Sequence, residues 1–432
     1  MTQRIPPPTP HIVIVGAGFA GLACAQQLGG SDVAVTLIDR RNYHLFAPLL
    51  YQVATAVLSP GEIAEPIRRV LSRHQNITVL LGEVEGVDTN ARQVRVDGRA
   101  IPYDELVLAT GATHSYFGHP EWERFAPGLK TLEDARRIRT QVLMAFERAE
   151  MEADPTERER LMTIAVIGGG PTGVEMAGAV AELARLALVK DFRHINPAEA
   201  RVVLLEAAPR ILLAFPEDLA VYAERALKRL GVTIRTGTPV EDISEQGVTL
   251  KDGFLPASVK IWGAGVEASP VGRWLGIETD RAGRVRVNPD LSVPGLEHVY
   301  VLGDVSLLDG PNGRPLPGLA QVADQQGRYL GQALLARLKG RKAPGPFRYR
   351  SRGNLAVVGR NSAVIDFDGT HLRGFPAWVL WGIVHIYLLV GFQNRFLVVM
   401  RWLWAYLTSS RGARIIAEEV AEERVEQRDS TG

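Results

Sequence analysis

The sequence predicts an α/β fold with two domains that each contain a parallel β-sheet, followed by a C-terminal helical segment. Three observations support this prediction. An apolar, β-branched stretch at residues 11–15 runs straight into a glycine-rich turn, and the same pattern returns about 150 residues later. The segment 374–394 differs in character, because it contains no Asp, Glu, Lys or Arg.

The first glycine-rich turn, residues 16–21, reads Gly-Ala-Gly-Phe-Ala-Gly and precedes an Ala- and Leu-rich helix. In this pattern Gly16 permits a tight turn, Gly18 lets the backbone approach a pyrophosphate, and Gly21 lets the helix pack against the strand. The diphosphate would bind at the helix N-terminus. The next apolar strand ends at Asp39, whose carboxylate suits a pair of ribose hydroxyls. We interpret this unit as a Rossmann-type dinucleotide site; an ordinary turn with incidental glycines is the alternative.

The second copy begins with the strand 163–167 and reads Gly-Gly-Gly-Pro-Thr-Gly at residues 168–173. A helix follows, and the next strand, 201–205, ends at Glu206. This acid comes later than in the first copy, because residues 190–200 are predicted to form an inserted loop. Two copies in the same structural context predict two separate dinucleotide sites.

The remaining segments fit this two-domain plan. The predicted elements are strands at 77–81, 106–111, 260–265 and 299–304, antiparallel meanders at 84–104 and 236–251, and helices at 133–150 and 320–338. The charged residues 152–160 are predicted to form a surface connection. The aromatic and apolar stretch 46–54 is either core or the wall of a pocket, and the sequence leaves both interpretations open.

The composition excludes several classes of function. The chain has 49 basic and 48 acidic residues and a net charge of +1, which gives no support for nucleic-acid binding. Cys24 is the only cysteine, so an internal disulfide, a Cys-x-x-Cys redox pair and a four-cysteine metal or iron–sulfur site are excluded. We predict no metal and place Cys24 in the core. Residues 1–10 do not have the pattern of a secretory signal, so a cytoplasmic location is expected.

The C-terminal segment 374–408 combines apolar residues, arginines and four of the seven tryptophans. Its uncharged stretch 376–390 has 15 residues, whereas a membrane-spanning helix needs about 20. The following helix has an apolar face formed by Phe396, Val399, Met400, Leu403 and Leu407. We therefore expect in-plane contact with a membrane, with Trp and Tyr at the headgroup level. A single span and a buried dimer or domain interface are the alternatives.

Two further expectations concern polar residues of this segment. His385 is expected to be packed rather than to serve as a ligand. Four arginines are expected to meet anionic headgroups: Arg395, Arg401, Arg411 and Arg414.

The two glycine-rich turns, with residues 109–111 (Ala-Thr-Gly) and 301–304 (Val-Leu-Gly-Asp), resemble the two-dinucleotide-binding flavoprotein reductases of the glutathione-reductase fold. Residues 320–325 (Ala-Gln-Val-Ala-Asp-Gln) and the apolar, aromatic C-terminus are similar to those of type II NADH:quinone oxidoreductases. The resemblance extends from about residue 10 to about residue 416.

The resemblance implies FAD in the first site, NADH as the substrate of the second, and a quinone near Gln321 and Gln325. Asp39 would bind the adenosine ribose of FAD, and Asp304 its ribityl or phosphate part. The positive end of the helix that begins near Ala320 would point at the reduced flavin.

In the second site, Glu206 would bind both ribose hydroxyls of NADH and repel a 2′-phosphate. Glu175 would lie beside the nicotinamide, where it could order NADH or a proton path. The predicted catalytic residues are therefore Glu175, Gln321 and Gln325. The predicted FAD site comprises Gly16, Gly18, Phe19, Ala20, Gly21, Asp39, Arg40, Val84, Ala109, Thr110, Gly111, Gly303, Asp304, Ala320 and Gln321. The predicted NADH site comprises Gly168, Gly170, Gly173, Glu175 and Glu206.

These inferences predict a peripheral membrane enzyme on the cytoplasmic side of the cell membrane, which passes electrons from NADH through FAD to a quinone without pumping protons. The predicted domains are an FAD domain at 1–118 and 270–370, an NADH domain at 119–269, and C-terminal membrane-associating helices with a charged tail at 371–432. The alternatives are a soluble reductase of a small electron-carrier protein and a non-catalytic flavin or NADH sensor. A homodimer is a further expectation that the sequence leaves open.

Overall fold

The computed structural model describes residues 9–311, 313–367, 369–408 and 411–416. The chain forms two compact units. The first unit consists of Met1–Leu45, Ala64–Thr113 and Val266–Arg352, and the second of Phe46–Ile63, His114–Gly265 and Gly353–Gly432. The predicted boundaries differ from this division chiefly because residues 46–63 and the segment from residue 353 onward belong to the second unit. Each unit has its own parallel sheet, so the predicted α/β class is confirmed.

The first unit is built on a six-stranded sheet with the order β20-β21-β9-β1-β2-β5. Its strands are β1 (His11–Val15), β2 (Ala34–Asp39), β5 (Ile77–Leu81), β9 (Glu105–Leu108), β20 (Ser292–Val293) and β21 (Leu296–Val301). All neighbouring pairs are parallel except β20 with β21. The first strand is fully buried at Ile12, Val13 and Ile14, as expected of a central strand in a sheet covered on both faces.

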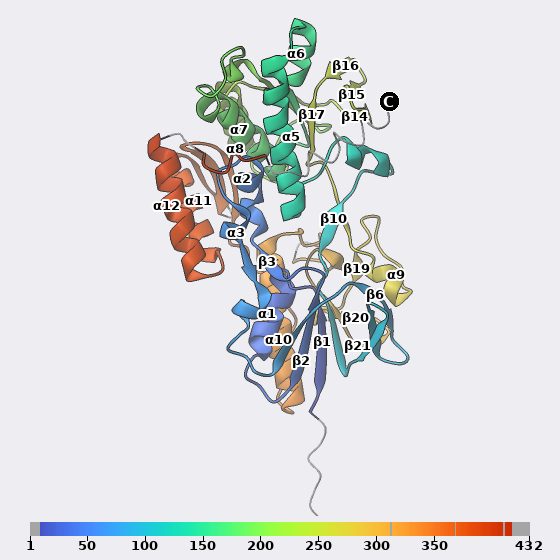
Figure 1. Ribbon diagram of the computed structural model, residues 1–432. Coiled ribbons are helices and arrows are strands. Elements are labelled where there is room, and N and C mark those ends of the chain that lie inside the picture. The colour runs from blue at the N-terminus through green and yellow to red at the C-terminus, as the bar shows by residue number, and fades with distance from the viewer. Residues whose placement is uncertain (1–8, 312, 368, 409–410, 417–432) are drawn as a thin grey trace, which may run out of the picture. The chain divides into compact units, whose positions relative to one another are not determined.

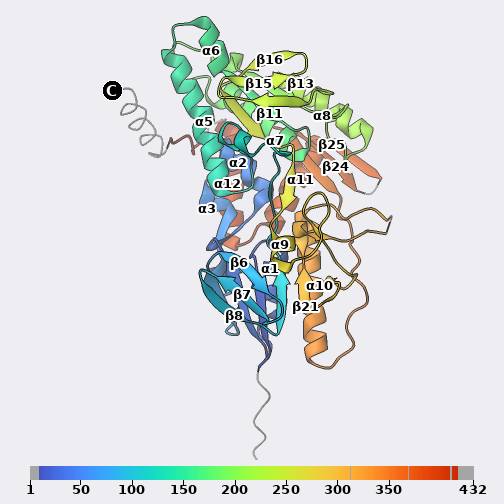
Figure 2. The same ribbon diagram turned by 90° about the vertical axis from the view of Figure 1, so that its right-hand side faces the viewer.

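Helices α1 (Phe19–Leu28) and α10 (Ala320–Leu338) pack against each other in the first unit (Figure 1). Their close approach depends on Gly327, because a Cβ there would collide with the Ala20 carbonyl. The predicted meander is also present, as β6 (Val84–Asp88), β7 (Gln93–Val96) and β8 (Arg99–Pro102) (Figure 2). The unit also contains β3 (Tyr43–Leu45), β4 (Ala64–Pro66), α4 (Ile67–Val70), β18 (Val266–Ala268), α9 (Val271–Leu275), β19 (Val285–Arg286), η5 (Gly303–Val305) and β22 (Ser306–Leu307), and β10 (Ala112–His114) begins in it.

The second unit has a four-stranded parallel sheet with the order β13-β12-β11-β17. Its strands are β11 (Thr163–Ile167), β12 (Arg201–Leu205), β13 (Val232–Arg235) and β17 (Val259–Trp262). Its helices are α5 (Leu132–Met151), α6 (Pro155–Leu161), α7 (Pro171–Glu182) and α8 (Glu217–Arg229). The meander consists of β14 (Val240–Ile243), β15 (Gly247–Leu250) and β16 (Gly253–Pro256). Shorter segments are η1 (Ala47–Leu49), α2 (Leu50–Ala54), α3 (Pro60–Ile63), η2 (Pro120–Arg124), η3 (Leu183–Ala187) and η4 (Pro197–Glu199).

The C-terminal part of the second unit is a three-stranded antiparallel sheet followed by two helices. These elements are β23 (Asn354–Gly359), β24 (Ser362–Phe367), β25 (Thr370–Gly374), α11 (Phe375–Leu388) and α12 (Phe392–Thr408). Helix α11 packs on β24 and β25, and the two helices lie side by side (Figure 1). The rings of Trp381 and Trp402 stack with their centroids 5.4 Å apart. In the described part of the chain, every helix is too short or too polar to cross a bilayer.

Candidate active site

The first glycine turn joins β1 to α1 and leaves only its middle glycine open. Gly16 has φ +98° and packs against the backbone of Ala109, so a side chain there would be strained and would clash. Gly21 packs beneath the Gly16 carbonyl. A Cβ at Gly18 would meet no protein atom within 4 Å. This geometry fits the predicted approach of a diphosphate to the N-terminus of α1.

Asp39 stabilises this turn from the end of β2. Its Oδ2 accepts the Ala17 N–H at 2.6 Å, and its Oδ1 accepts the Arg41 N–H at 2.7 Å. A carboxylate oxygen can accept more than one hydrogen bond, so capacity remains for ribose hydroxyls. The buried His44 donates from Nδ1 to the Ala17 carbonyl at 2.9 Å, which fixes the turn from the other side.

The second glycine turn repeats this arrangement in the other unit. Gly168 has φ +106° and packs against Ala264, Gly173 packs beneath the Gly168 carbonyl, and a Cβ at Gly170 would meet no protein atom within 4 Å. Glu206 takes the place of the aspartate, since its Oε2 accepts the Gly169 N–H at 2.5 Å and its Oε1 accepts the Ala208 N–H at 2.7 Å. The two turns therefore have the same backbone geometry and the same use of an acid.

The other residues predicted for the FAD site lie in the first unit with the first turn. Gly303 has φ +73° and donates its N–H to Oε1 of the buried Gln326 at 2.6 Å, which fixes the backbone next to Asp304. The N-cap residue of α10, Leu319, makes no side-chain capping bond. Thr110 bonds the hydroxyl of Ser269 at 2.5 Å. Of the others, Arg40 is exposed and Val84 is buried.

Gln321 and Gln325 are bonded to the main chain of the segment that leads out of the first unit. Gln325 donates from Nε2 to the Arg350 carbonyl at 2.9 Å and accepts the Arg350 N–H at 3.0 Å. Gln321 accepts the Arg352 N–H at 3.0 Å. The two glutamines share one face of α10, as the spacing predicts. In this structure they are hydrogen-bonded to the main chain of Arg350 and Arg352.

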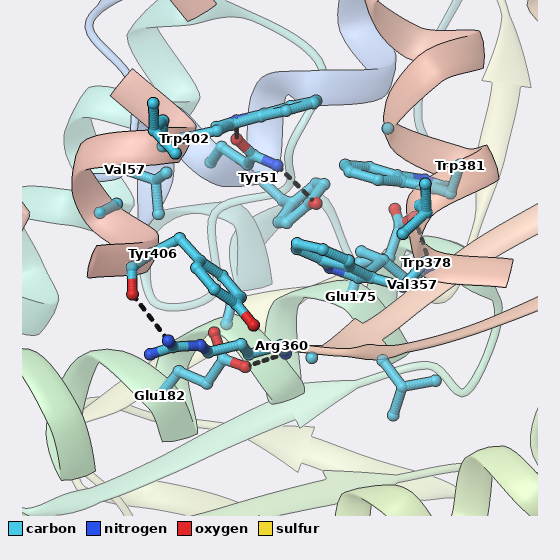
Figure 3. A pocket seen from close by; sticks show the side chains of 18 of the residues that line it. Tyr51, Val57, Glu175, Glu182, Val357, Arg360, Trp378, Trp381, Trp402 and Tyr406 are labelled. Atoms are coloured by element: carbon cyan, nitrogen blue, oxygen red, sulfur yellow. Dashed lines mark hydrogen bonds between the residues drawn. The ribbon is translucent and has the colours of Figure 1, made fainter. Parts of the chain in front are cut away.

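The second unit contains a largely apolar pocket of about 490 Å³ between α7, β23, α11 and α12. The residues that line its aromatic part include Tyr51, Trp378, Trp381, Trp402 and Tyr406 (Figure 3). Five lining residues of the helix pair are also exposed: Phe375, Val379, Ile383, Val399 and Leu403. The pocket therefore opens onto an apolar surface.

Glu175 brings a carboxyl group to this pocket from the second turn of α7. Burial raises the pKa of Glu175 to about 8. A hydrogen bond from the Val357 N–H at 3.3 Å acts in the opposite direction. At neutral pH this side chain is therefore mostly a neutral acid that can donate a hydrogen bond or a proton. Glu175 belongs to the second unit, whereas Gln321 and Gln325 belong to the first.

A chain of three side chains lies at the wall formed by α2 and α12. Trp402 donates from Nε1 to Oε1 of Gln52 at 2.7 Å, and Gln52 donates from Nε2 to the Tyr51 hydroxyl at 2.8 Å. Tyr51 and Gln52 are both buried. The open question about the stretch 46–54 is thus answered, because it is core and pocket wall together.

The helix pair has the exposed apolar face that the sequence predicts. The exposed apolar side chains on α12 are Phe396, Leu397, Val399, Met400, Leu403, Trp404 and Leu407, and those on α11 include Phe375, Ile383 and Tyr387. His385 bonds the Trp381 carbonyl through Nδ1 at 2.7 Å, and burial lowers its pKa to about 4, so it is packed as expected.

The expected headgroup role of Arg411 is wrong. Its side chain is buried and donates to the carbonyls of Thr55 at 2.9 Å and Ala179 at 3.0 Å and to the Glu182 carboxylate at 3.3 Å. A buried guanidinium needs such acceptors, and the ends of short helices supply them. The other three arginines also have internal partners: Leu389 for Arg395, Glu62 for Arg401, and Asp191 with Ala187 for Arg414.

Comparison with known proteins identifies the family. Residues 10–327 match the family model of the pyridine nucleotide-disulphide oxidoreductases, and residues 351–411 match that of the NDH2 C-terminal domain. The type II NADH:quinone oxidoreductase Ndh of Mycobacterium tuberculosis is 42% identical over 96% of this chain and 92% of its own length. This chain belongs to the type II NADH:quinone oxidoreductases. The resemblance that the motifs indicated is therefore confirmed.

Other members of the family and solved structures agree. NdhA of Mycobacterium tuberculosis is 42% identical over 95% of this chain and 90% of its own length. An NDH2 structure from Plasmodium falciparum in complex with NADH covers 95% of this chain and 100% of its own, with a TM-score of 0.86 at 20% identity. A sulfide:quinone oxidoreductase structure from Aquifex aeolicus covers 97% of this chain and 95% of its own, with a TM-score of 0.69 at 19% identity. At these identities the two structures show the fold.

The family model is named for disulphide chemistry, but this chain has one cysteine. Cys24 is fully buried, and burial raises the pKa of its thiol to about 12. It is therefore a core residue, as predicted, and not a nucleophile. In the described residues, no group of three or more His, Cys, Asp or Glu side chains is arranged to hold a metal ion.

Proposed function

We propose that this enzyme oxidises NADH and reduces a membrane quinone, with FAD as its resident cofactor and without pumping protons. The observation that carries this proposal is the apolar pocket that opens onto the exposed face of α11 and α12. An acceptor that dissolves in lipid can enter such a pocket from a membrane, whereas a hydrophilic acceptor gains nothing from its lining.

The first glycine turn fits the diphosphate of FAD. Gly18 leaves the backbone accessible and has no side chain to cap α1, the helix N-terminus favours negative charge, and Asp39 retains acceptor capacity for the adenosine ribose. When bound, FAD accepts a hydride equivalent from NADH and passes two electrons to the quinone. The positive end of the α10 dipole would favour negative charge on the reduced cofactor.

The second glycine turn fits NADH for the same reasons. Gly170 leaves the backbone accessible at the N-terminus of α7, and Glu206 stands at the end of β12 where the ribose hydroxyls are expected. Its negative charge would repel the 2′-phosphate of NADPH. Glu175, on the same helix, would serve as a neutral donor in the quinone pocket.

The exposed face of the helix pair would attach the enzyme to the cytoplasmic surface of the cell membrane. Each large apolar side chain removed from water contributes roughly 1.5–3 kcal/mol, so several together suffice for stable attachment. The same face could instead pair two copies of the chain. A membrane is favoured because the pocket opens on this face and would be covered in a dimer of this kind.

A soluble reductase of a small carrier protein is the competing function. Such an enzyme would need a polar docking face, and the surface around this pocket is apolar. The test is turnover of purified protein with NADH and the short-chain quinone decylubiquinone, alongside fractionation of cells into membranes and cytosol. We expect rapid NADH oxidation only with quinone present, and most of the protein with the membranes. The proposal would be refuted by a protein that stays in the cytosol and oxidises NADH at the same rate with and without the quinone.

The glutamines of α10 need a separate test, because the structure gives them main-chain partners. If Gln325 contacts the quinone, Gln325→Ala slows reoxidation of the flavin by quinone and leaves reduction by NADH unchanged. If it only holds Arg350, both half-reactions fall together with thermal stability. Stopped-flow absorbance of the two half-reactions separates these outcomes.

A further inference from the structure

The hydrogen bonds at the α2–α12 wall of the pocket determine where the proton of the Tyr51 hydroxyl points. An indole N–H can only donate, so the partner of Trp402 Nε1 must be the carbonyl oxygen of Gln52. The amide nitrogen of Gln52 then faces Tyr51 and donates to its oxygen at 2.8 Å. The Tyr51 oxygen is therefore an acceptor in this pair, and its own O–H must be directed elsewhere.

The Tyr51 O–H has no acceptor among the residues that the structure describes. Figure 3 shows the hydroxyl pointing into the pocket, toward the side where Trp378 and Trp381 lie. The side chain is buried apart from the pocket that it lines, so an acceptor for this O–H must lie in the pocket. A buried donor without a partner costs roughly 1–3 kcal/mol, which a ligand oxygen could recover.

We propose that Tyr51 donates a hydrogen bond to a carbonyl oxygen of the quinone, and that Gln52 and Trp402 are positioning residues that hold its hydroxyl in this orientation. The inference rests on the proposed function and adds a specificity-determining residue to it. Trp402 acts without touching the quinone carbonyl, because its N–H decides which end of the Gln52 amide faces Tyr51.

The surroundings keep Tyr51 a neutral donor. Burial raises the pKa of Tyr51 well above its ordinary value, and the nearby charges of Glu175 and Glu182 also raise it. The charge of Arg411 lowers it. The hydroxyl therefore keeps its proton throughout the physiological range. A quinone carbonyl accepts hydrogen bonds and cannot donate them, so an apolar pocket with an inward-pointing neutral O–H is complementary to it.

The test uses the full-length, flavin-loaded enzyme with decylubiquinone and, separately, ferricyanide, which accepts electrons but has no carbonyl group. Tyr51→Phe removes the donor and keeps the ring. Trp402→Phe removes the N–H, so the Gln52 amide can turn and accept the Tyr51 proton itself. Two controls remove comparable groups outside the pocket: Tyr222→Phe, whose hydroxyl bonds Ser362 at 3.2 Å, and Trp122→Phe, whose N–H bonds Asp242 at 3.0 Å.

We expect Tyr51→Phe and Trp402→Phe each to raise the KM for decylubiquinone about tenfold, the equivalent of one hydrogen bond. The double variant should show no larger increase than either single variant, because both lose the same bond. Ferricyanide reduction should stay unchanged in all of them, and the two controls should behave like the unaltered enzyme with both acceptors.

Three results would overturn the inference: an unchanged KM in Tyr51→Phe, an unchanged KM in Trp402→Phe, or an equal loss with decylubiquinone and ferricyanide. Failure of the proposed function looks different. In that case the unaltered enzyme would reduce ferricyanide with NADH but would not reduce decylubiquinone at all.

Discussion

The two glycine turns have the same backbone geometry, but the helices that follow them have different neighbours. Helix α1 presents small buried residues to α10, with Ala20 against Gly327. Helix α7 packs on β23 and lines the pocket with Glu175 and Glu182. The residue of α1 that corresponds to Glu175, seven positions after the first glycine, is the buried Ala23. Under the proposed function, the first turn would serve a dinucleotide site alone, and the second would join a dinucleotide site to the quinone pocket.

The largest expected effect comes from filling the open centre of each turn. Gly18 and Gly170 both have negative φ and open space at the Cβ position, so valine fits the backbone and obstructs only a ligand. Gly18→Val should yield colourless protein. Gly170→Val should stay yellow and lose reduction by NADH. Absorption spectra and an NADH titration check both results, and colour lost in both variants would break the assignment of one cofactor to each turn.

The next effect concerns the surface onto which the pocket opens. The triple change Phe396→Ser, Trp404→Ser and Leu407→Ser should reduce partitioning to membranes about a hundredfold or more, since three exposed apolar side chains are lost. None of the three lines the pocket, so turnover with decylubiquinone should persist. Sedimentation with anionic vesicles measures the partitioning.

The matched control changes three exposed apolar residues elsewhere to serine: Leu81, Met151 and Phe254. Equal membrane loss in both triple variants would contradict the assignment of the attachment face. Truncation after Gly369, which the sequence suggests as a test of membrane attachment, is less informative than these substitutions. It removes half of the pocket and the buried Arg411, so unfolding is its expected result.

A smaller effect is expected from the acid of the second turn. Glu206→Gln keeps a hydrogen-bonding side chain but loses the charge, so the preference for NADH over NADPH should fall by about 1.5–3 kcal/mol, roughly 10- to 150-fold. The ratio of kcat/KM for the two substrates measures it. Asp39→Asn, in the first turn, should leave that ratio unchanged. Equal kcat/KM values in the unaltered enzyme would contradict this role of Glu206.

The last effect concerns stability rather than activity and sharpens the contrast between Ala23 and Glu175. The pKa of Glu175 rises from 4.5 to about 8 on folding, so the folded state holds a proton that the unfolded state releases between these values. This contribution to stability is complete below the unfolded pKa and is lost as the pH rises through the folded pKa. The thermal stability of Glu175→Gln relative to the unaltered enzyme should therefore improve from about pH 5 to about pH 9. A difference independent of pH would contradict the raised pKa.

The glycine turns could be predicted from the sequence because their geometry is local. Each strand, turn, helix and acid lies within a stretch of about 40 residues, and steric demands on glycine leave few alternatives. Asp39 and Glu206 were found in this way, and the structure places each on the backbone N–H that follows the first glycine of its turn.

The pocket could not be predicted, because its parts are distant in sequence. Gln52 and Trp402 are separated by 350 residues, and nothing in either segment alone indicates the pair. The aromatic density of residues 46–54 was the only signal, and it fits core and pocket equally. Arg411 shows the reverse problem, since a basic residue next to an amphipathic helix looks like a headgroup contact until its buried acceptors are known.

The central claim is that electrons pass from NADH through the flavin to a quinone. An anaerobic sequential titration tests it most directly, with the visible flavin absorbance as the readout. The account predicts that one equivalent of NADH bleaches the flavin and that one equivalent of decylubiquinone then restores its absorbance within the turnover time. A flavin that NADH bleaches but decylubiquinone does not reoxidise would contradict the account.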